Sequence, residues 1–121
     1  MGKRRQISRD KHLKQYDKNK KLSEEELFLE EKYFDWKITI IFYAALHLID
    51  STYSHKYQPK NHDTRNNYIE SYYKNDEDVR INYFMLEELS RKSRYDCIKI
   101  KEKKVKKAQE ALNNLEQKLI T

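Results

Sequence analysis

The pattern of apolar and polar residues predicts a strongly apolar helix in the middle of the chain. From Trp36 to about Ser54, apolar side chains fall on nearly every face of a helix, which is typical of a helix enclosed by neighbouring helices or by a second subunit. The β-branched residues near its start would also suit a strand, but the length of the segment favours a helix. Asp35 is its expected N-terminal cap.

Two helices with narrower apolar stripes are predicted towards the C-terminus. Asn75 and Asp76 form a break and a new start, and the helix that follows is expected to run to about Tyr95. The last helix, about 101–120, repeats apolar residues at alternating spacings of three and four, which indicates a seam against one neighbour. The two stripes consist of Val79, Tyr83, Leu86, Leu89 and Ser93, and of Val105, Ala108, Leu112, Leu115 and Leu119.

Weaker signals predict helices in the first third of the chain. Ser8 is placed to cap a first helix, and Ser23 with Glu26 forms a capping-box pattern ahead of Leu27 and Phe28. This region therefore holds either two short helices or one helix with a kink.

A further short helix is expected from Asn61 or Asp63 to Tyr73. It follows a loop over 54–61 that contains the only proline of the chain. Together, the predicted elements make an all-α fold, an antiparallel bundle of four to five helices in a single domain.

Composition excludes several classes of function. A single glycine rules out Gly-rich phosphate loops, and the single cysteine, Cys97, permits no internal disulfide and no cysteine-based zinc site. The four histidines lack paired metal-ligand spacing. We therefore expect no metal and no cofactor. The lone cysteine and the lack of an apolar run of about 20 residues predict a cytoplasmic protein without a membrane partner.

Charge is unevenly distributed along the chain. The formal net charge is +6, but residues 1–22 hold nine basic and two acidic side chains, whereas residues 23–100 hold eleven basic and fifteen acidic ones. We therefore divide the chain into a basic N-terminal arm or first helix, 1–22, and a bundle, 23–121. The arm could contact nucleic-acid phosphates or be a solvated terminus; its candidate residues are Lys3, Arg4, Arg5, Arg9 and Lys11.

One polar stripe interrupts the central helix. Tyr43, His47, Asp50 and Ser51 are spaced to share a face. Asp50 lies one turn beyond His47 and could fix its tautomer, as a general base requires. The alternative is a hydrogen-bonded histidine in a polar seam between helices.

A second candidate site lies at the start of the short helix. His62 and Arg65 are three residues apart, so both side chains could serve one anion near the positive end of the helix. The alternative is structural: Asp63 caps the helix and Arg65 pairs with an acidic neighbour.

The third candidate lies at the end of the following helix. Arg91 and Arg94, followed by Tyr95, could grip a phosphate from one face. Arg91 also has Glu87 four residues before it, which suits an ion pair within the helix. Arg94 has Ser90 at that position and is the better candidate.

Three segments in order resemble small prokaryotic HEPN-domain proteins. They are the run from Asp35 to Asp50 (DWKITIIFYAALHLID), the run from His62 to Asn66 (HDTRN) and the run SRKSRY that ends at Tyr95. The resemblance covers roughly 33–96 and implies a helical bundle that pairs into a homodimer. Many members of the superfamily are metal-independent endoribonucleases of toxin–antitoxin, CRISPR-linked and antiviral systems.

The chain departs from the usual HEPN signature, an Arg followed after four to six residues by a His. Only Arg5 and His12 have this spacing, and they lie in the basic arm, where we interpret the match as coincidence. One hypothesis is RNA cleavage, with His47 or His62 as general base and Arg65 and Arg94 stabilising phosphate charge. The other is a non-catalytic dimeric module that binds nucleic acid, a nucleotide or a protein. The third hypothesis is a protein that acts only in complex with an operon-encoded partner.

Overall fold

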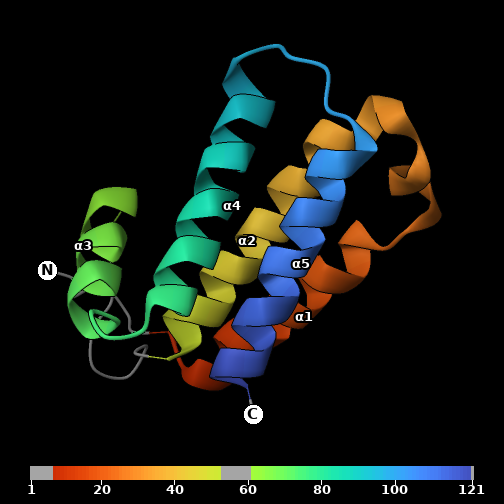
Figure 1. Cartoon of the computed structure of the whole chain (residues 1–121). Helices are drawn as coiled ribbons and strands as arrows, with labels where there is room; N and C mark the ends of the chain where they lie inside the picture. Colours follow the sequence, from red (N-terminus) through yellow and green to blue (C-terminus); the bar gives the residue numbers. More distant parts are fainter. Residues whose placement is uncertain (1–6, 53–60, 121) are drawn as a thin grey trace, which may run out of the picture.

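A computed structural model describes residues 7–52 and 61–120. Within these ranges every regular element is a helix, which confirms the predicted all-α bundle. The elements are α1 (Arg9–Ser23), the 3₁₀ turns η1 (Glu26–Leu29) and η2 (Glu31–Tyr33), α2 (Phe34–Ser51), α3 (His62–Tyr72), α4 (Glu77–Tyr95) and α5 (Glu102–Leu119). Figure 1 shows α1, α2, α4 and α5 packed together, each running opposite to the one before it in the chain, with α3 outside them. None of the described helices has the length and apolarity needed to cross a membrane.

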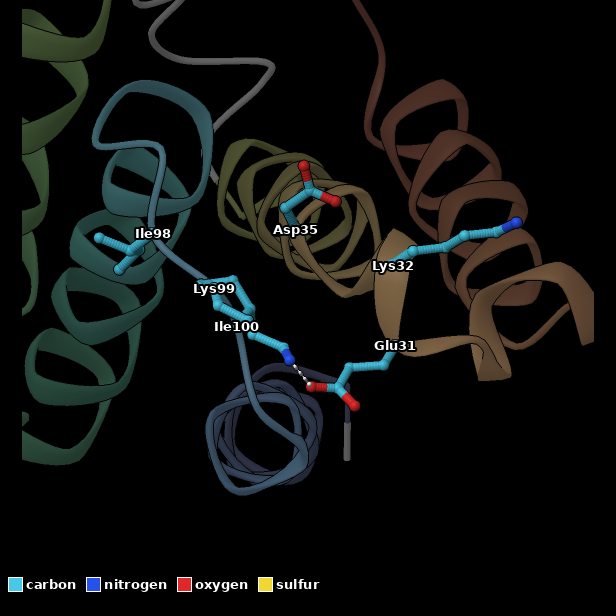
Figure 2. Close-up of a pocket in the computed structure, with 6 residues that line it drawn as sticks. All are labelled: Glu31, Lys32, Asp35, Ile98, Lys99 and Ile100. Atoms are coloured by element: carbon cyan, nitrogen blue, oxygen red, sulfur yellow. Dashed lines mark ion pairs between the residues drawn. The ribbon is translucent and has the colours of Figure 1, made fainter.

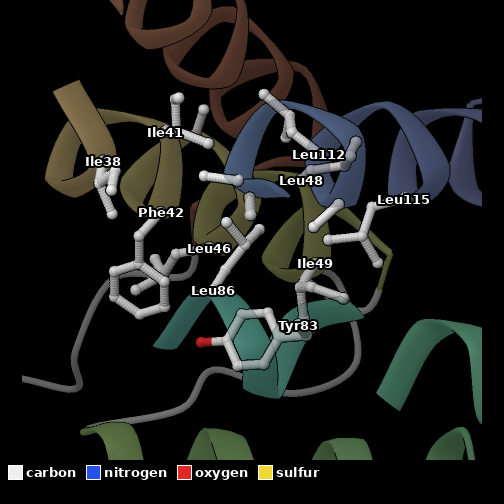
Figure 3. Close-up of a cluster of buried hydrophobic side chains, with 14 of the residues drawn as sticks. Ile38, Ile41, Phe42, Leu46, Leu48, Ile49, Tyr83, Leu86, Leu112 and Leu115 are labelled. Atoms are coloured by element: carbon white, nitrogen blue, oxygen red, sulfur yellow. The ribbon is translucent and has the colours of Figure 1, made fainter. Parts of the chain in front are cut away.

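The apolar helix α2 is the centre of the bundle, as predicted, and it packs against α1, α4 and α5. Ile38, Phe42, Leu48 and Ile49 are fully buried, and they meet side chains such as Leu86 in the cluster of Figure 3. The apolar residues on several faces of α2 thus have neighbours within a single chain.

The start of α2 differs from the prediction. The cap position is Tyr33, which makes no side-chain cap hydrogen bond. Asp35 instead lies inside the first turn, and its Oδ1 accepts a hydrogen bond from the backbone N–H of Trp36 at 2.9 Å. The described part of the helix ends at Ser51, with Thr52 as its C-terminal cap. The predicted continuation to Ser54 and the Pro59 loop lie outside the described residues.

Other helix starts follow the expected cap chemistry. Ser8 Oγ accepts from the N–H of Lys11 at the start of α1, and Asp76 caps α4. At α3, Asn61 and Thr64 form a capping box. Because Asn61 fills the cap position, the alternative in which Asp63 caps this helix is wrong.

The predicted capping box of Ser23 and Glu26 is also wrong. Ser23 is the last residue of α1, and its Oγ donates a 2.6 Å hydrogen bond back to the carbonyl of Lys20. The hydroxyl therefore serves the end of α1 and does not start a new helix. The chain continues through η1 and η2, where Phe28 is buried and Leu27 is exposed.

The first helix is part of the bundle. Its residues His12 and Tyr16 are buried against the core, although the rest of the helix is mostly charged. Lys20 reaches across to α5 and pairs with Glu116 at 2.8 Å. The basic residues Arg9 and Lys11 lie exposed on its first turn, whereas Lys3, Arg4 and Arg5 lie outside the described residues.

Candidate functional site

A polar stripe runs along the whole length of α2. Of the four residues predicted for the stripe, Tyr43, His47 and Asp50 are preceded at helical spacing by Asp35 and Thr39. The fourth, Ser51, donates its hydroxyl to the backbone carbonyl of Leu48 at 2.6 Å. Figure 2 shows the Asp35 carboxylate on the side of α2 that faces away from α5. The stripe is therefore opposite the α5 side of the core, and α1, α3 and α4 supply partners for its side chains.

At the C-terminal end of the stripe, Asp50 and Arg65 form a buried ion pair. Arg65 Nε donates to Asp50 Oδ1 at 2.8 Å and Nη2 donates to Oδ2 at 2.9 Å. Only 10% of the Arg65 side chain and 3% of the Asp50 side chain are exposed. This bidentate pair joins α3 to α2. This ion pair is the alternative in which Arg65 pairs with an acidic neighbour.

The ion pair separates two residues that were predicted to share one anion. Arg65 points into the protein, whereas His62, one turn earlier on α3, is exposed and its ring centroid lies 6.0 Å from that of Phe42. The structure therefore does not bring His62 and Arg65 together at one exposed anion site, because the Arg65 guanidinium is buried on Asp50.

His47 has a partner that the sequence did not predict. Its Nδ1 lies 3.1 Å from Nδ1 of His12, a residue of α1 that is only 3% exposed. Asp50, the expected partner, instead accepts from Arg65 with both carboxylate oxygens. The sequence feature that could have identified His12 is its position one turn before Tyr16, on the face of α1 that is buried.

The two histidines require different tautomers, because one Nδ1 must donate and the other accept. His12 Nε2 is buried without a hydrogen-bond partner in the described residues. A buried polar atom without a partner costs free energy whether it is a donor or an acceptor.

Burial lowers the pKa of both histidines, and the neighbouring His12 lowers the pKa of His47 further. Asp50 raises each pKa and Arg65 lowers it, but both contributions are smaller than that of burial. At the pH at which free histidines begin to protonate, the pair is therefore still neutral in the folded protein.

Acid should consequently destabilise the protein through this pair. As the pH falls below the ordinary histidine pKa of 6.5, the unfolded chain binds protons before the folded chain does, so the free energy of unfolding decreases. Urea titrations at about pH 8 and about pH 5 should show this decrease. It should be smaller in His12→Gln/His47→Gln and unchanged in the exposed control His62→Gln; an equal decrease in the double variant would contradict the assignment.

The middle of the stripe holds Arg94 in place. Arg94 Nη1 donates to Tyr43 Oη at 3.1 Å, and Nε donates to the backbone carbonyl of Ser90 at 3.3 Å. The guanidinium lies 5.2 Å from the ring centroid of Tyr95 and 5.9 Å from that of Phe42. These contacts fix a partly exposed cation against aromatic rings.

Arg94 is the centre of a groove between α3 and α4, of about 340 Å³. We call it the Arg94 groove. Its walls include His62, Asp63 and Asn66 from α3 and Arg91, Arg94 and Tyr95 from α4, with Glu87 below. The groove thus gathers His62, Arg91, Arg94 and Tyr95 from the predicted site, and leaves His47, Asp50 and Arg65 outside its lining.

Glu87 does not form the ion pair within the helix that was the alternative role for Arg91. Asn66 Nδ2 donates to both carboxylate oxygens of Glu87, at 3.1 and 3.0 Å. Arg91 is exposed and forms no ion pair with another described residue. At the next positions along α4, Lys92 does pair with Glu88, at 3.3 Å.

A second pocket adjoins the Arg94 groove and was not predicted. Trp36 and Thr39 of α2 and Ser93, Arg94 and Tyr95 of α4 line it. A third hollow, in Figure 2, lies between η2 and the segment before α5, where Lys99 lies 3.7 Å from Glu31. It contains none of the predicted site residues. In the described part of the chain, no three acidic, histidine or cysteine side chains are placed to hold a metal ion.

The chain matches no family model, no curated protein and no solved structure.

Proposed function

We propose that this protein binds single-stranded RNA in the Arg94 groove, as a HEPN-like binding module. The observation that carries the proposal is the fixed position of Arg94. Its guanidinium has five N–H donors, of which one bonds Tyr43 and one bonds Ser90. Arg94 lines a groove that is open to solvent, where a phosphate oxygen would accept from its other donors.

The surroundings of Arg94 suit a single strand. Tyr95 is 69% exposed beside the guanidinium, so a base can stack on its ring while the phosphate contacts the arginine. Asp63 and Glu87 offset the charges of Arg91 and Arg94 within the groove. Binding should therefore depend on directed hydrogen bonds and stacking more than on net charge.

The resemblance to HEPN proteins supports the same surface. Two of the three similar segments supply groove residues, His62 and Asn66 from the second and Arg91, Arg94 and Tyr95 from the third. The first segment supplies Tyr43, which hydrogen-bonds Arg94 from outside the lining. A homodimer, a cytoplasmic location and a defence or toxin–antitoxin operon with a second protein are part of this proposal.

Replacing Arg94 with alanine tests the function. We expect affinity for a fluorescently labelled oligouridine to fall about 10- to 100-fold, because charge-assisted hydrogen bonds to a phosphate are lost. Fluorescence anisotropy measures this. Lys92→Ala, which removes the same charge two residues away on α4, is the matched control and should retain affinity. Equal losses in both variants, or no binding by the unaltered protein, would contradict the proposal.

His62 supports a second candidate function, metal-independent cleavage of the bound strand. It is exposed and lines the same groove as Arg94, so it could take the proton of a ribose 2′-hydroxyl. The oxygen would then attack the adjacent phosphate, giving a 2′,3′-cyclic phosphate and a 5′-hydroxyl end. His47 is paired with His12 and is the weaker candidate for the base.

The two functions give different results with His62→Ala. Cleavage predicts RNA fragments with cyclic phosphate ends, made about 100-fold more slowly or not at all by the variant, with oligouridine affinity retained. Intact RNA after incubation with the unaltered protein would eliminate cleavage and leave binding.

A further inference from the structure

We propose that the pocket beside the Arg94 groove is a binding site for a guanine base. The pocket, which we call the Trp36 pocket, is lined by Asp35, Trp36, Thr39, Ser93, Arg94 and Tyr95 and has a volume of about 270 Å³. This inference deepens the proposed function and rests on it, since the base would belong to the bound RNA.

Two solvent-exposed aromatic side chains line the Trp36 pocket. Trp36, on the first turn of α2, is 57% exposed, and Tyr95, at the end of α4, is 69% exposed. Large exposed aromatic rings at one small pocket suit a flat π-system, and every base can stack on such a ring. The aromatic rings therefore predict a nucleobase without saying which one.

The polar edge of the pocket selects among the bases. Thr39 Oγ1 donates its proton to the carbonyl of Asp35 at 2.9 Å, and Ser93 Oγ donates to the carbonyl of Leu89 at 2.8 Å. Both hydroxyls therefore present only lone pairs to the pocket. Asp35 adds a carboxylate, which accepts hydrogen bonds and cannot donate them when ionised.

The Asp35 carboxylate forms no ion pair with a described cation, and its one hydrogen bond among the described residues comes from the N–H of Trp36. A ligand at this edge must therefore bring hydrogen-bond donors. Guanine presents two adjacent donors, N1–H and the N2 amino group, which match the two oxygens of one carboxylate. Adenine and cytosine each present one amino group beside a ring acceptor, which would face the carboxylate without a hydrogen bond.

Arg94 connects the two sites. It lines both the Arg94 groove and the Trp36 pocket, so a nucleotide can place its base in the Trp36 pocket and its phosphate on the guanidinium. The site therefore suits guanosine monophosphate itself as well as a guanine within a strand.

The experiment uses a reporter that is already in the pocket. Trp36 is the only tryptophan of the chain, so its emission reports stacking at this one site. Titration of the full-length protein with guanosine monophosphate should quench the emission, with a dissociation constant about tenfold lower than that for adenosine monophosphate. Equal quenching by both nucleotides, or quenching by neither, would overturn the guanine site.

Three variants make the test specific. Asp35→Asn keeps the size of the side chain but replaces one acceptor with a donor, so the preference for guanine should fall to about twofold or less. Tyr95→Ala should weaken guanosine monophosphate about tenfold. Tyr72→Ala, which removes another exposed tyrosine, on α3, should change neither value. A preference that survives in Asp35→Asn would overturn the role of the carboxylate, and circular dichroism verifies that each variant is folded.

Failure of this inference can be told apart from failure of the proposed function. Oligouridine anisotropy reports strand binding without any guanine, whereas Trp36 emission reports the pocket without any strand. Oligouridine binding without discrimination between the two nucleotides removes the guanine site alone. Guanosine monophosphate binding without oligouridine binding supports the pocket and removes the RNA proposal.

Discussion

Replacing Asp50 with alanine is expected to lower the free energy of unfolding by about 3–5 kcal/mol. The substitution leaves the Arg65 guanidinium in a site where its side chain is 10% exposed, without the Asp50 carboxylate that accepts from its Nε and Nη2. Loss of an ion-pair partner in such a site is costly because the remaining charge stays desolvated. Urea denaturation followed by circular dichroism measures the change.

The double variant Asp50→Leu/Arg65→Met separates the buried charge from the packing. It removes both charges and fills a similar volume, so it should recover most of the stability lost in Asp50→Ala. Glu88→Ala, which breaks the exposed pair with Lys92, should cost less than about 1 kcal/mol. A loss in Asp50→Ala no larger than that of Glu88→Ala would show that the pair is not buried in solution.

Replacing Phe42 with alanine is the second large change, with an expected loss of about 3–5 kcal/mol. Phe42 is fully buried on α2, and its ring contacts the ring of Tyr83 at a centroid distance of 5.8 Å. The same ring lies under the guanidinium of Arg94. The cavity should therefore reduce stability and also loosen Arg94.

Phe42→Leu is the matched control, because it retains most of the apolar volume and should cost less than Phe42→Ala. Leu27→Ala, at an exposed position of η1, should change stability by less than about 0.5 kcal/mol. Thermal and urea denaturation of the three variants test this order. A Phe42→Ala protein as stable as Leu27→Ala would contradict the position of α2 at the centre of the core.

Most of the fold could be predicted because its signals are local. The all-round apolar run of α2 and the apolar seam of α5 follow from helical periodicity, although α5 packs against both α2 and α4 and not against the one neighbour that was predicted. Ser8 caps the helix that it was expected to cap, and Asp76, in the predicted break, caps α4. The error at Ser23 has a local cause too. A serine hydroxyl can serve the helix that ends as well as the one that begins, and periodicity did not distinguish these here.

The candidate site was only partly predictable, because its contacts join distant positions. The stripe on α2 follows from spacing along one helix, and the importance of Arg94 follows from the absence of a partner at Ser90. The pairing of Asp50 with Arg65 and that of His12 with His47 span 15 and 35 positions. Such contacts depend on helix packing, which no spacing within one helix encodes.

The outer helix α3 has a consequence for the energetics of any ligand. It stands apart from the close packing of the other four helices and is joined to them by Arg65, by the buried Ile69 and Tyr73, and by the Asn66–Glu87 hydrogen bonds. Among the described residues, α3 makes fewer contacts with the other helices than they make with one another, so it should detach at a smaller free-energy cost than global unfolding. Its amides should therefore exchange with solvent deuterium earlier than those of α2. A ligand that bridges α3 and α4 would slow that exchange, and part of its binding free energy would be spent on keeping α3 closed.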